Sequence, residues 1–204
     1  MAIQAVVFDV GGVLKLPLET DWNQKWSTRL NMQPEELWAR LHAIGCNGIL
    51  GTCTAAEWLD GLREVTGMDQ AQIDEYMADL WADYLGTHNA ELSAYFGSLR
   101  PRFQTAILSN SFLGAREKEQ AAYGFEDLCD FIIYSHEVGI AKPDARIFAL
   151  TCERLGLQPS EVIFVDDLEP YVAAARAFGI HAIQFKNNAQ VIADIEACIR
   201  ANAY

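Results

Sequence analysis

Short apolar runs alternate with helix-like stretches through the second half of the chain. The runs are rich in Val, Ile and Phe, which is typical of strands buried on both faces of a sheet. With one run near the N-terminus, they lie at residues 3–8, 104–109, 130–134, 161–166 and 180–185. The stretches between the later runs predict helices at residues 112–123, 144–155, 170–178 and 189–201. Strands that alternate with helices predict right-handed crossovers and a parallel sheet, so the expected fold class is α/β.

The segment between residues 16 and 97 has a different pattern and no convincing strand. Pro34 suits the first turn of one expected helix, and Thr54 with Glu57 fits the capping box of another. Apolar residues recur at helical spacing over residues 69–84, which predicts a third helix. All tryptophans fall in this segment: Trp22, Trp26, Trp38, Trp58 and Trp81. We interpret most of them as the core of a helical insertion and its interface with the rest of the fold, with the first two as candidates to line a pocket.

These patterns divide the chain into two expected domains. Residues 1–15 and 98–204 would form the core domain, and residues 16–97 an inserted α-helical cap over the site. A chain of 204 residues is long enough for one substantial core with such an insertion. The glycines of the loop at residues 45–51 suit either a tip that dips toward the site or a plain connector.

Polar residues stand at or near the ends of several predicted strands. They are Asp9 followed by Gly11 and Gly12, Ser109 with Asn110, Lys142 in a short loop, and Asp166 with Asp167. In open α/β sheets, ligands bind at the edge formed by the carboxyl ends of the strands. A nucleophile, a hydroxyl, a cation and a carboxylate pair would meet at this edge. This combination favours phosphoryl transfer or a related hydrolysis.

Composition narrows the classes of partner. Hydrophobic residues make up 51% of the chain and charged residues 21%, which indicates a folded globular protein. The formal net charge of −13 argues against broad binding to nucleic acid or to anionic membranes. No apolar run is long enough to cross a bilayer, and the N-terminus lacks the basic region and cleavage site of a secretory signal. We therefore expect a cytoplasmic protein with no nucleic-acid or membrane partner.

The five cysteines are an odd number, and none forms a Cys-x-x-Cys pair: Cys46, Cys53, Cys129, Cys152 and Cys198. We interpret them as reduced, mostly buried thiols, which suits a cytoplasm. The alternative is a bridge between Cys46 and Cys53 across a loop. Nothing in the sequence pairs a cysteine with a base, so a cysteine nucleophile is not expected.

Four motifs in this order resemble the haloacid dehalogenase-like (HAD) hydrolase superfamily, in particular the subfamily with a C1-type helical cap. The motifs are Phe8-Asp9-Val10-Gly11-Gly12-Val13-Leu14, Ile107-Leu108-Ser109-Asn110-Ser111, Ala141-Lys142-Pro143-Asp144 and Phe164-Val165-Asp166-Asp167. Each motif alone is weak, but four in order at predicted strand edges are specific. The resemblance covers essentially the whole chain. It implies a Rossmann-like parallel core with an inserted helical cap.

The resemblance also implies the catalytic roles. Asp9 would attack phosphorus and form an aspartyl-phosphate. Ser109 and the backbone N–H of Asn110 would bind a phosphoryl oxygen. Lys142 would neutralise developing charge and keep Asp9 ionised.

The resemblance further implies Mg²⁺ as the cofactor. Its ligands would be Asp9, the backbone carbonyl of Gly11 and Asp166, with Asp167 as a ligand or an outer-shell group. Oxygen ligands of this kind suit Mg²⁺. The cation would reduce the repulsion between an anionic nucleophile and an anionic phosphate.

Two positions depart from the typical phosphatases of this superfamily. Gly11 stands where they have a second aspartate, the general acid–base, and such a group typically contributes about 10²–10⁴ in rate. Leaving groups that need little protonation would suffer least from its absence. Pro170 and Tyr171 stand where relatives often have another acidic or amide residue, and Glu169 is the nearest substitute.

Three functions follow from these observations. The first is a Mg²⁺-dependent phosphatase of a small phosphorylated metabolite, acting as a monomer or a homodimer. The second is a metal-free 2-haloacid dehalogenase, which Gly11 suits and the pair Asp166-Asp167 opposes. The third is a HAD fold that binds a phospho-ligand without catalysis.

Overall fold

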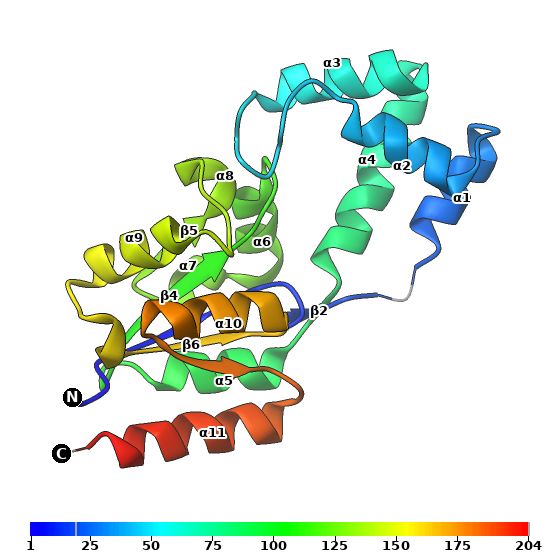
Figure 1. Cartoon of the computed structure of the whole chain (residues 1–204). Helices are drawn as coiled ribbons and strands as arrows, with labels where there is room; N and C mark the ends of the chain where they lie inside the picture. Colours follow the sequence, from blue (N-terminus) through cyan, green and yellow to red (C-terminus); the bar gives the residue numbers. More distant parts are fainter. Residues whose placement is uncertain (19, 204) are drawn as a thin grey trace.

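The computed structural model describes residues 1–18 and 20–203 and contains a five-stranded parallel sheet with the order β5-β4-β1-β6-β7 (Figure 1). Its strands are β1 (Ala5–Phe8), β4 (Gln104–Ser109), β5 (Phe131–Tyr134), β6 (Val162–Asp166) and β7 (His181–Gln184). Each overlaps one of the apolar runs, so the five predicted strands and the α/β class are confirmed.

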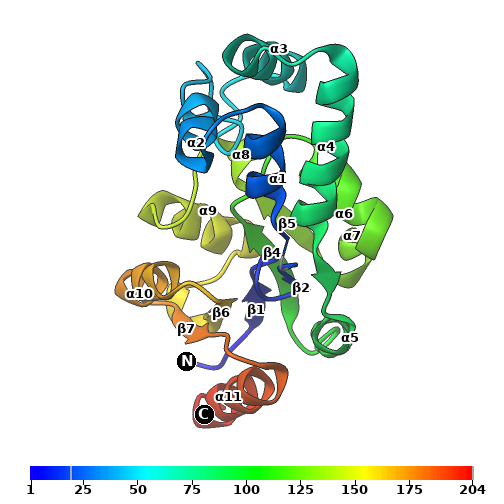
Figure 2. The same ribbon diagram turned by 90° about the vertical axis from the view of Figure 1, so that its right-hand side faces the viewer.

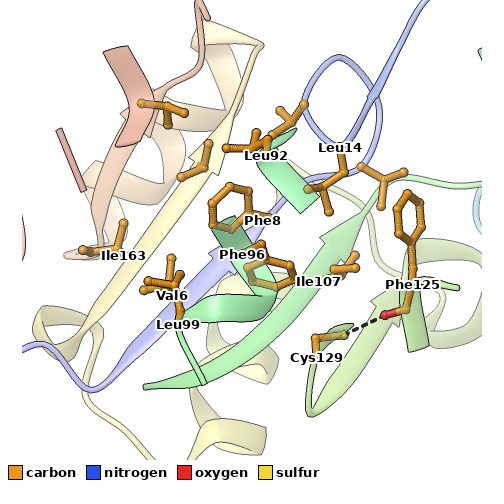
Figure 3. Close-up of a cluster of buried hydrophobic side chains, with 14 of the residues drawn as sticks. Val6, Phe8, Leu14, Leu92, Phe96, Leu99, Ile107, Phe125, Cys129 and Ile163 are labelled. Carbon is orange, nitrogen blue, oxygen red and sulfur yellow. Dashed lines mark hydrogen bonds between the residues drawn. The ribbon is translucent and has the colours of Figure 1, made fainter. Parts of the chain in front are cut away.

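Side chains alternate between the two faces of the central strand β1. Val6 and Phe8 belong to one core cluster, and Ala5 and Val7 to the other. On the first face, α5 (Ala90–Ser98) and α11 (Asn188–Ala201) cover the sheet, and the ring of Phe8 lies 4.6 Å from that of Phe96 (Figure 3). Burying a phenylalanine completely stabilises the fold by about 1.5–3 kcal/mol, so this contact anchors α5 to the sheet.

The second face is covered by α9 (Ala145–Leu155) and α10 (Glu169–Phe178). Gly156 and Gly179 follow these helices with φ values of 69° and 103°, as left-handed caps require. The remaining elements of this half are α6 (Ala115–Tyr123), α7 (Phe125–Leu128), α8 (Ser135–Val138) and the 3₁₀ turn η1 (Pro159–Glu161). Helices on both faces of a parallel sheet make the core Rossmann-like, as the resemblance implies.

Four helices, α1 (Trp22–Arg29), α2 (Pro34–His42), α3 (Ala55–Thr66) and α4 (Gln70–Leu85), form a group at one end of the molecule (Figure 2). We call them the insert helices. They have a hydrophobic cluster of their own, centred on Trp26, Leu37 and Leu62. The expected capping box is confirmed: Thr54 Oγ1 accepts from the N–H of Glu57, and Glu57 Oε2 accepts from the N–H of Thr54.

The two connections between the sheet and the insert helices pair with each other. β2 (Lys15–Leu16) and β3 (Thr87–His88) form an antiparallel ribbon with Lys15 opposite His88. The prediction of no strand between residues 16 and 97 is therefore wrong here, because a two-residue strand leaves no periodic pattern in the sequence. Helix α5 follows directly and packs against the sheet. The division into residues 1–15 with 98–204 and residues 16–97 stays a prediction.

The interpretation of the cysteines as reduced thiols is wrong for one pair. Cys46 and Cys53 form a disulfide, with their Cα atoms 5.8 Å apart. The intervening turn folds back on itself because the N–H of Asn47 donates to Thr52 Oγ1 and the N–H of Thr52 donates to Asn47 O. The other three cysteines are free, two of them buried. Within the described ranges, no helix has both the length and the apolar character needed to cross a bilayer.

Candidate active site at the carboxyl edge of the sheet

Asp9 lies immediately beyond the end of β1, at the centre of the sheet edge. Its N–H donates to Val165 O over 2.8 Å, which extends the parallel pairing by one residue. The residue is 7% exposed, and its Oδ1 lies 2.9 Å from Nζ of Lys142. The nucleophile expected from the sequence is therefore buried, ordered by the sheet and paired with the expected cation.

Lys142 joins two carboxylates in the interior. Its fully buried Nζ lies 2.6 Å from Asp166 Oδ2 and 2.9 Å from Asp9 Oδ1, and it donates to Leu108 O over 3.1 Å. Burial alone would lower the pKa of this ammonium, but the charges of the two aspartates outweigh it, so the pKa of Lys142 is raised. The side chain is a permanent cation at neutral pH.

The side chain of Asn110 holds the loop that carries Lys142. Its Nδ2 donates to Lys142 O and its Oδ1 accepts from the N–H of Lys142, both over 2.8 Å. Nδ2 also lies 3.3 Å from the hydroxyl of Tyr171. The sequence predicts a role only for the backbone N–H of Asn110. The reciprocal amide contact was missed because it joins residues 32 positions apart.

Three carboxylates converge beside this lysine. One ligand atom from each of Asp9, Asp166 and Asp167 lies within 4.8 Å of the others. Burial and then the charge of Asp9 raise the pKa of Asp166 to about 6, against the effect of Lys142. Burial and Asp9 likewise raise the pKa of Asp167. Three acidic groups around one ammonium leave an excess of negative charge, which is the donor set that suits Mg²⁺.

The two glycines after Asp9 differ in their surroundings. Gly12 has a φ of +72°, and a Cβ there would lie 2.3 Å from Asp167 Oδ2, so only glycine fits. A Cβ on Gly11 would meet nothing within 4 Å. The backbone at position 11 therefore leaves space for the Cβ of a larger residue. That the Gly11 carbonyl binds the metal stays a prediction.

The remaining predicted residue, Ser109, ends β4 and is 2% exposed. β4 pairs with β1 in the register that sets Ile107 beside Phe8, so Ser109 reaches the same edge as Asp9. The structure thus brings together Asp9, Ser109, Asn110, Lys142, Asp166 and Asp167, and their individual roles stay predictions. Glu169, the suggested substitute acid, instead faces Arg176 at 3.6 Å on the exposed surface of α10.

A second buried ion pair lies close to this site and was missed from the sequence. Nζ of Lys15 is 2.8 Å from Oε1 of Glu119, with side chains 7% and 0% exposed. Oε2 of Glu119 accepts from the hydroxyl of Tyr134 over 2.6 Å, and Nζ of Lys15 stands 3.2 Å from the ring centre of Tyr84. Here burial outweighs the attraction of Glu119, so the pKa of Lys15 is lowered. The one signal in the sequence was a lysine inside an apolar run.

A cavity of about 1000 Å³ lies between the insert helices and the sheet edge. Asn110 and Ser111 line it at the end nearest the candidate catalytic residues. Of the two tryptophans predicted as candidates, Trp22 lines the cavity, whereas Trp26 is wholly buried and donates to Asp79 Oδ2 over 2.8 Å. Trp38, Trp58 and Trp81, interpreted as insert core or as interface with the rest of the fold, also line the cavity.

The loop at residues 45–51 closes one wall of this cavity. Ser135 Oγ donates to Ile49 O over 2.8 Å. A Cβ on Gly48 would lie 2.3 Å from the ring of Phe112, so the loop backbone packs directly on a side chain of the core. The loop therefore reaches toward the site and is not a plain connector.

The chain was compared with known proteins. A family model described as haloacid dehalogenase-like hydrolase matches residues 3–179. A phosphatase of Mycobacterium tuberculosis is 31% identical over 193 residues, which are 89% of this chain and 87% of that protein. The acyl-CoA dehydrogenase family member 10 of Mus musculus is 27% identical over 96% of this chain, which spans only 19% of its length.

Two further comparisons bear on the site. The crystal structure of a HAD family enzyme from Bacteroides thetaiotaomicron, in complex with magnesium and inorganic phosphate, is 27% identical and has a TM-score of 0.75. The match covers 90% of this chain and 94% of that one. An (S)-2-haloacid dehalogenase of a Pseudomonas species is 32% identical over 125 residues, which are 61% of this chain and 52% of that protein.

Proposed function

We propose that this chain, which belongs to the haloacid dehalogenase-like hydrolases, is a Mg²⁺-dependent phosphatase that forms an aspartyl-phosphate on Asp9. The observation that carries the proposal is the cluster of Asp9, Asp166 and Asp167 beside the buried ammonium of Lys142. A dianionic phosphate could enter this cluster only if a divalent cation accompanied it. The magnesium and phosphate bound by the structurally similar enzyme of Bacteroides thetaiotaomicron agree with this requirement.

The residues divide the reaction between them. A carboxylate oxygen of Asp9 attacks phosphorus as the P–O bond to the leaving group breaks, and the leaving oxygen keeps the electron pair and takes a proton from water. Lys142 pairs with Asp9 and offsets the charge that develops on the phosphoryl group, while Ser109 and the N–H of Asn110 hold its oxygens. Bound Mg²⁺, held by Asp9, Asp166, Asp167 and the Gly11 carbonyl, would neutralise phosphate charge. Water then hydrolyses the aspartyl-phosphate and releases inorganic phosphate.

The first test is hydrolysis of p-nitrophenyl phosphate by the purified protein with Mg²⁺, with EDTA and with the variant Asp9→Asn. We expect turnover only in the wild-type protein with Mg²⁺. This substrate needs little protonation of its leaving group, so Gly11 does not obscure the result. Turnover that persists in EDTA or in Asp9→Asn would contradict the mechanism.

A metal-free 2-haloacid dehalogenase is the second candidate, and Gly11 together with the partial match to a Pseudomonas dehalogenase favours it. The three clustered carboxylates oppose it, because without a cation they would repel the carboxylate of a haloacid. Halide release from 2-chloropropionate in EDTA, with no hydrolysis of p-nitrophenyl phosphate, would establish this alternative.

The proposal includes a small phosphorylated metabolite as substrate, with no nucleic-acid or membrane partner. The net charge of −13 supports this restriction. A cytoplasmic location and a monomer or homodimer complete the proposal. Light scattering of the purified protein would decide between the two oligomeric states.

A further inference from the structure

The cavity beside the active site has an unusual aromatic wall. Each of the four insert helices contributes one tryptophan to it: Trp22, Trp38, Trp58 and Trp81. From the core side, the ring of Phe112 meets Trp58 edge-on at 4.9 Å and lies 6.2 Å from Trp81. Aromatic walls of this kind bind flat rings through edge and face contacts as well as through burial.

The same wall carries almost no charge. Among the described residues that line the cavity, none is a lysine, arginine, aspartate or glutamate. The ionisable side chains among its described lining residues are His42, Tyr76 and Tyr84, and Nδ1 of His42 lies 2.8 Å from Trp38 O. A second phosphate or a carboxylate on the substrate would find no cationic partner here. Sugar hydroxyls would lose water without enough hydrogen-bonding groups to replace it.

The size of the cavity matches this character. Its volume of about 1000 Å³ exceeds what a triose or pentose requires and suits a group of two or more fused rings. The cavity extends to Asn110 and Ser111. A substrate could therefore place its organic part in the cavity and its phosphate at the sheet edge.

Position 11 supplies an independent argument about the leaving group. Glycine there offers no side-chain proton to the departing oxygen. An aryl oxide is a weaker base than a sugar alkoxide and departs without being protonated in the transition state. An aromatic hydroxyl therefore suits both the wall of the cavity and the chemistry of position 11.

We infer that the substrate is a phosphate monoester of a neutral aromatic hydroxyl compound with at least two fused rings. This inference rests on the proposed phosphatase function. Asp9 forms a new P–O bond as the bond from phosphorus to the aryl oxygen breaks. The aryl oxide leaves with the electron pair and takes a proton from water, and a second water releases inorganic phosphate from Asp9.

The test compares kcat/KM for 2-naphthyl phosphate, phenyl phosphate, octyl phosphate and ribose 5-phosphate. The two aryl esters have leaving groups of similar acidity, so a difference between them reports on the cavity. We expect 2-naphthyl phosphate to exceed phenyl phosphate about tenfold, through a lower KM, because its second ring is buried. Equal values for the two aryl esters, or a higher value for the octyl or ribose ester, would overturn the inference and leave the phosphatase function standing.

A pair of variants locates the effect in the cavity. Trp38 lines the cavity and is 55% exposed, whereas Leu18 is 41% exposed and lies outside it. Trp38→Ala should lower kcat/KM for 2-naphthyl phosphate about tenfold, the usual effect of truncating an aromatic contact residue, and lower that for phenyl phosphate by clearly less. Leu18→Ala should change neither. Equal losses for both aryl esters in Trp38→Ala would contradict the inference.

Binding separates this inference from the function on which it rests. If no phosphate ester is hydrolysed, the phosphatase proposal fails. Naphthyl phosphonate and phenyl phosphonate, which have no ester bond, can then be titrated with Mg²⁺ while tryptophan fluorescence is followed. Tighter binding of the naphthyl compound supports the aromatic site, and equal or absent binding overturns it.

Discussion

Two buried lysines flank the candidate nucleophile, and they differ in one respect that decides their behaviour. Lys142 contacts two carboxylates, Asp9 and Asp166, whereas Lys15 contacts one carboxylate, Glu119, among the described residues. Both lose the water that would solvate an ammonium, yet the pKa of Lys142 is raised and that of Lys15 is lowered. The second carboxylate is what turns a costly buried charge into a stable one. A third carboxylate, Asp167, adds negative charge that Lys142 does not balance and that a metal cation would neutralise.

Removing Lys142 should have the largest effect. Lys142→Met leaves Asp9 and Asp166 facing each other without a cation. Loss of one such electrostatic partner typically lowers kcat by about 10²–10³, and an uncompensated buried charge costs about 3–5 kcal/mol of unfolding free energy. The measurements are p-nitrophenyl phosphate hydrolysis and urea unfolding in EDTA. Activity close to that of the wild type would refute the role of this lysine.

Replacing Lys15 in the Lys15–Glu119 pair should lower the stability of the fold and leave the hydrolytic activity unchanged. Lys15→Met strands Glu119 and should cost about 3 kcal/mol or more in urea unfolding, with hydrolysis at 25 °C retained. Adding Glu119→Gln removes the stranded charge and keeps an acceptor for the hydroxyl of Tyr134, so the double variant should recover most of the loss. A double variant no more stable than Lys15→Met would show that charge is not the cause.

Magnesium should stabilise the fold through the carboxylate cluster beside Lys142 and not through the Lys15–Glu119 pair. The three clustered carboxylates repel one another, so Mg²⁺ at about 100 times its Kd should stabilise the fold by about 2.7 kcal/mol. Asp167→Asn should reduce the rise in Tm. Asp60→Asn, which changes a 76% exposed carboxylate outside the cluster, should leave it intact. An equal rise in both variants would place the cation elsewhere.

The smallest effect is a pair of opposite pH dependences. Because the pKa of Lys15 is lowered, the folded protein releases its proton first, and its contribution to stability improves as pH rises toward 10.5. The pKa of Lys142 is raised, so its contribution is complete below 10.5 and is lost at higher pH. The difference in unfolding free energy between wild type and each Lys→Met variant, measured from pH 8 to 11, should show opposite slopes of at most about 1.4 kcal/mol per pH unit. Slopes of the same sign would refute the comparison.

The sequence predicted what short-range patterns determine. Apolar runs placed the five strands of the parallel sheet, and the polar residues at their ends met because parallel strands share one carboxyl edge. Thr54 and Glu57 located a helix start to the residue. Contacts between distant segments escaped prediction: the Lys15–Glu119 pair, the amide of Asn110 on the Lys142 loop, and the two-residue ribbon. The cavity escaped for the same reason, since four helices must first be oriented before their tryptophans can share a wall.

The ribbon of β2 and β3 has a mechanical consequence for the insert helices. Both crossings of the chain are fastened to each other there, and the hydroxyl of Tyr123 fastens them to α6 by donating to Leu85 O and Gly86 O. Two tethers joined at one point act as a single pivot. The loop at residues 45–51 makes a separate contact with the core, because Ser135 Oγ donates to Ile49 O and Gly48 packs on Phe112. A swing of the insert helices about the ribbon would therefore have to break this loop contact first.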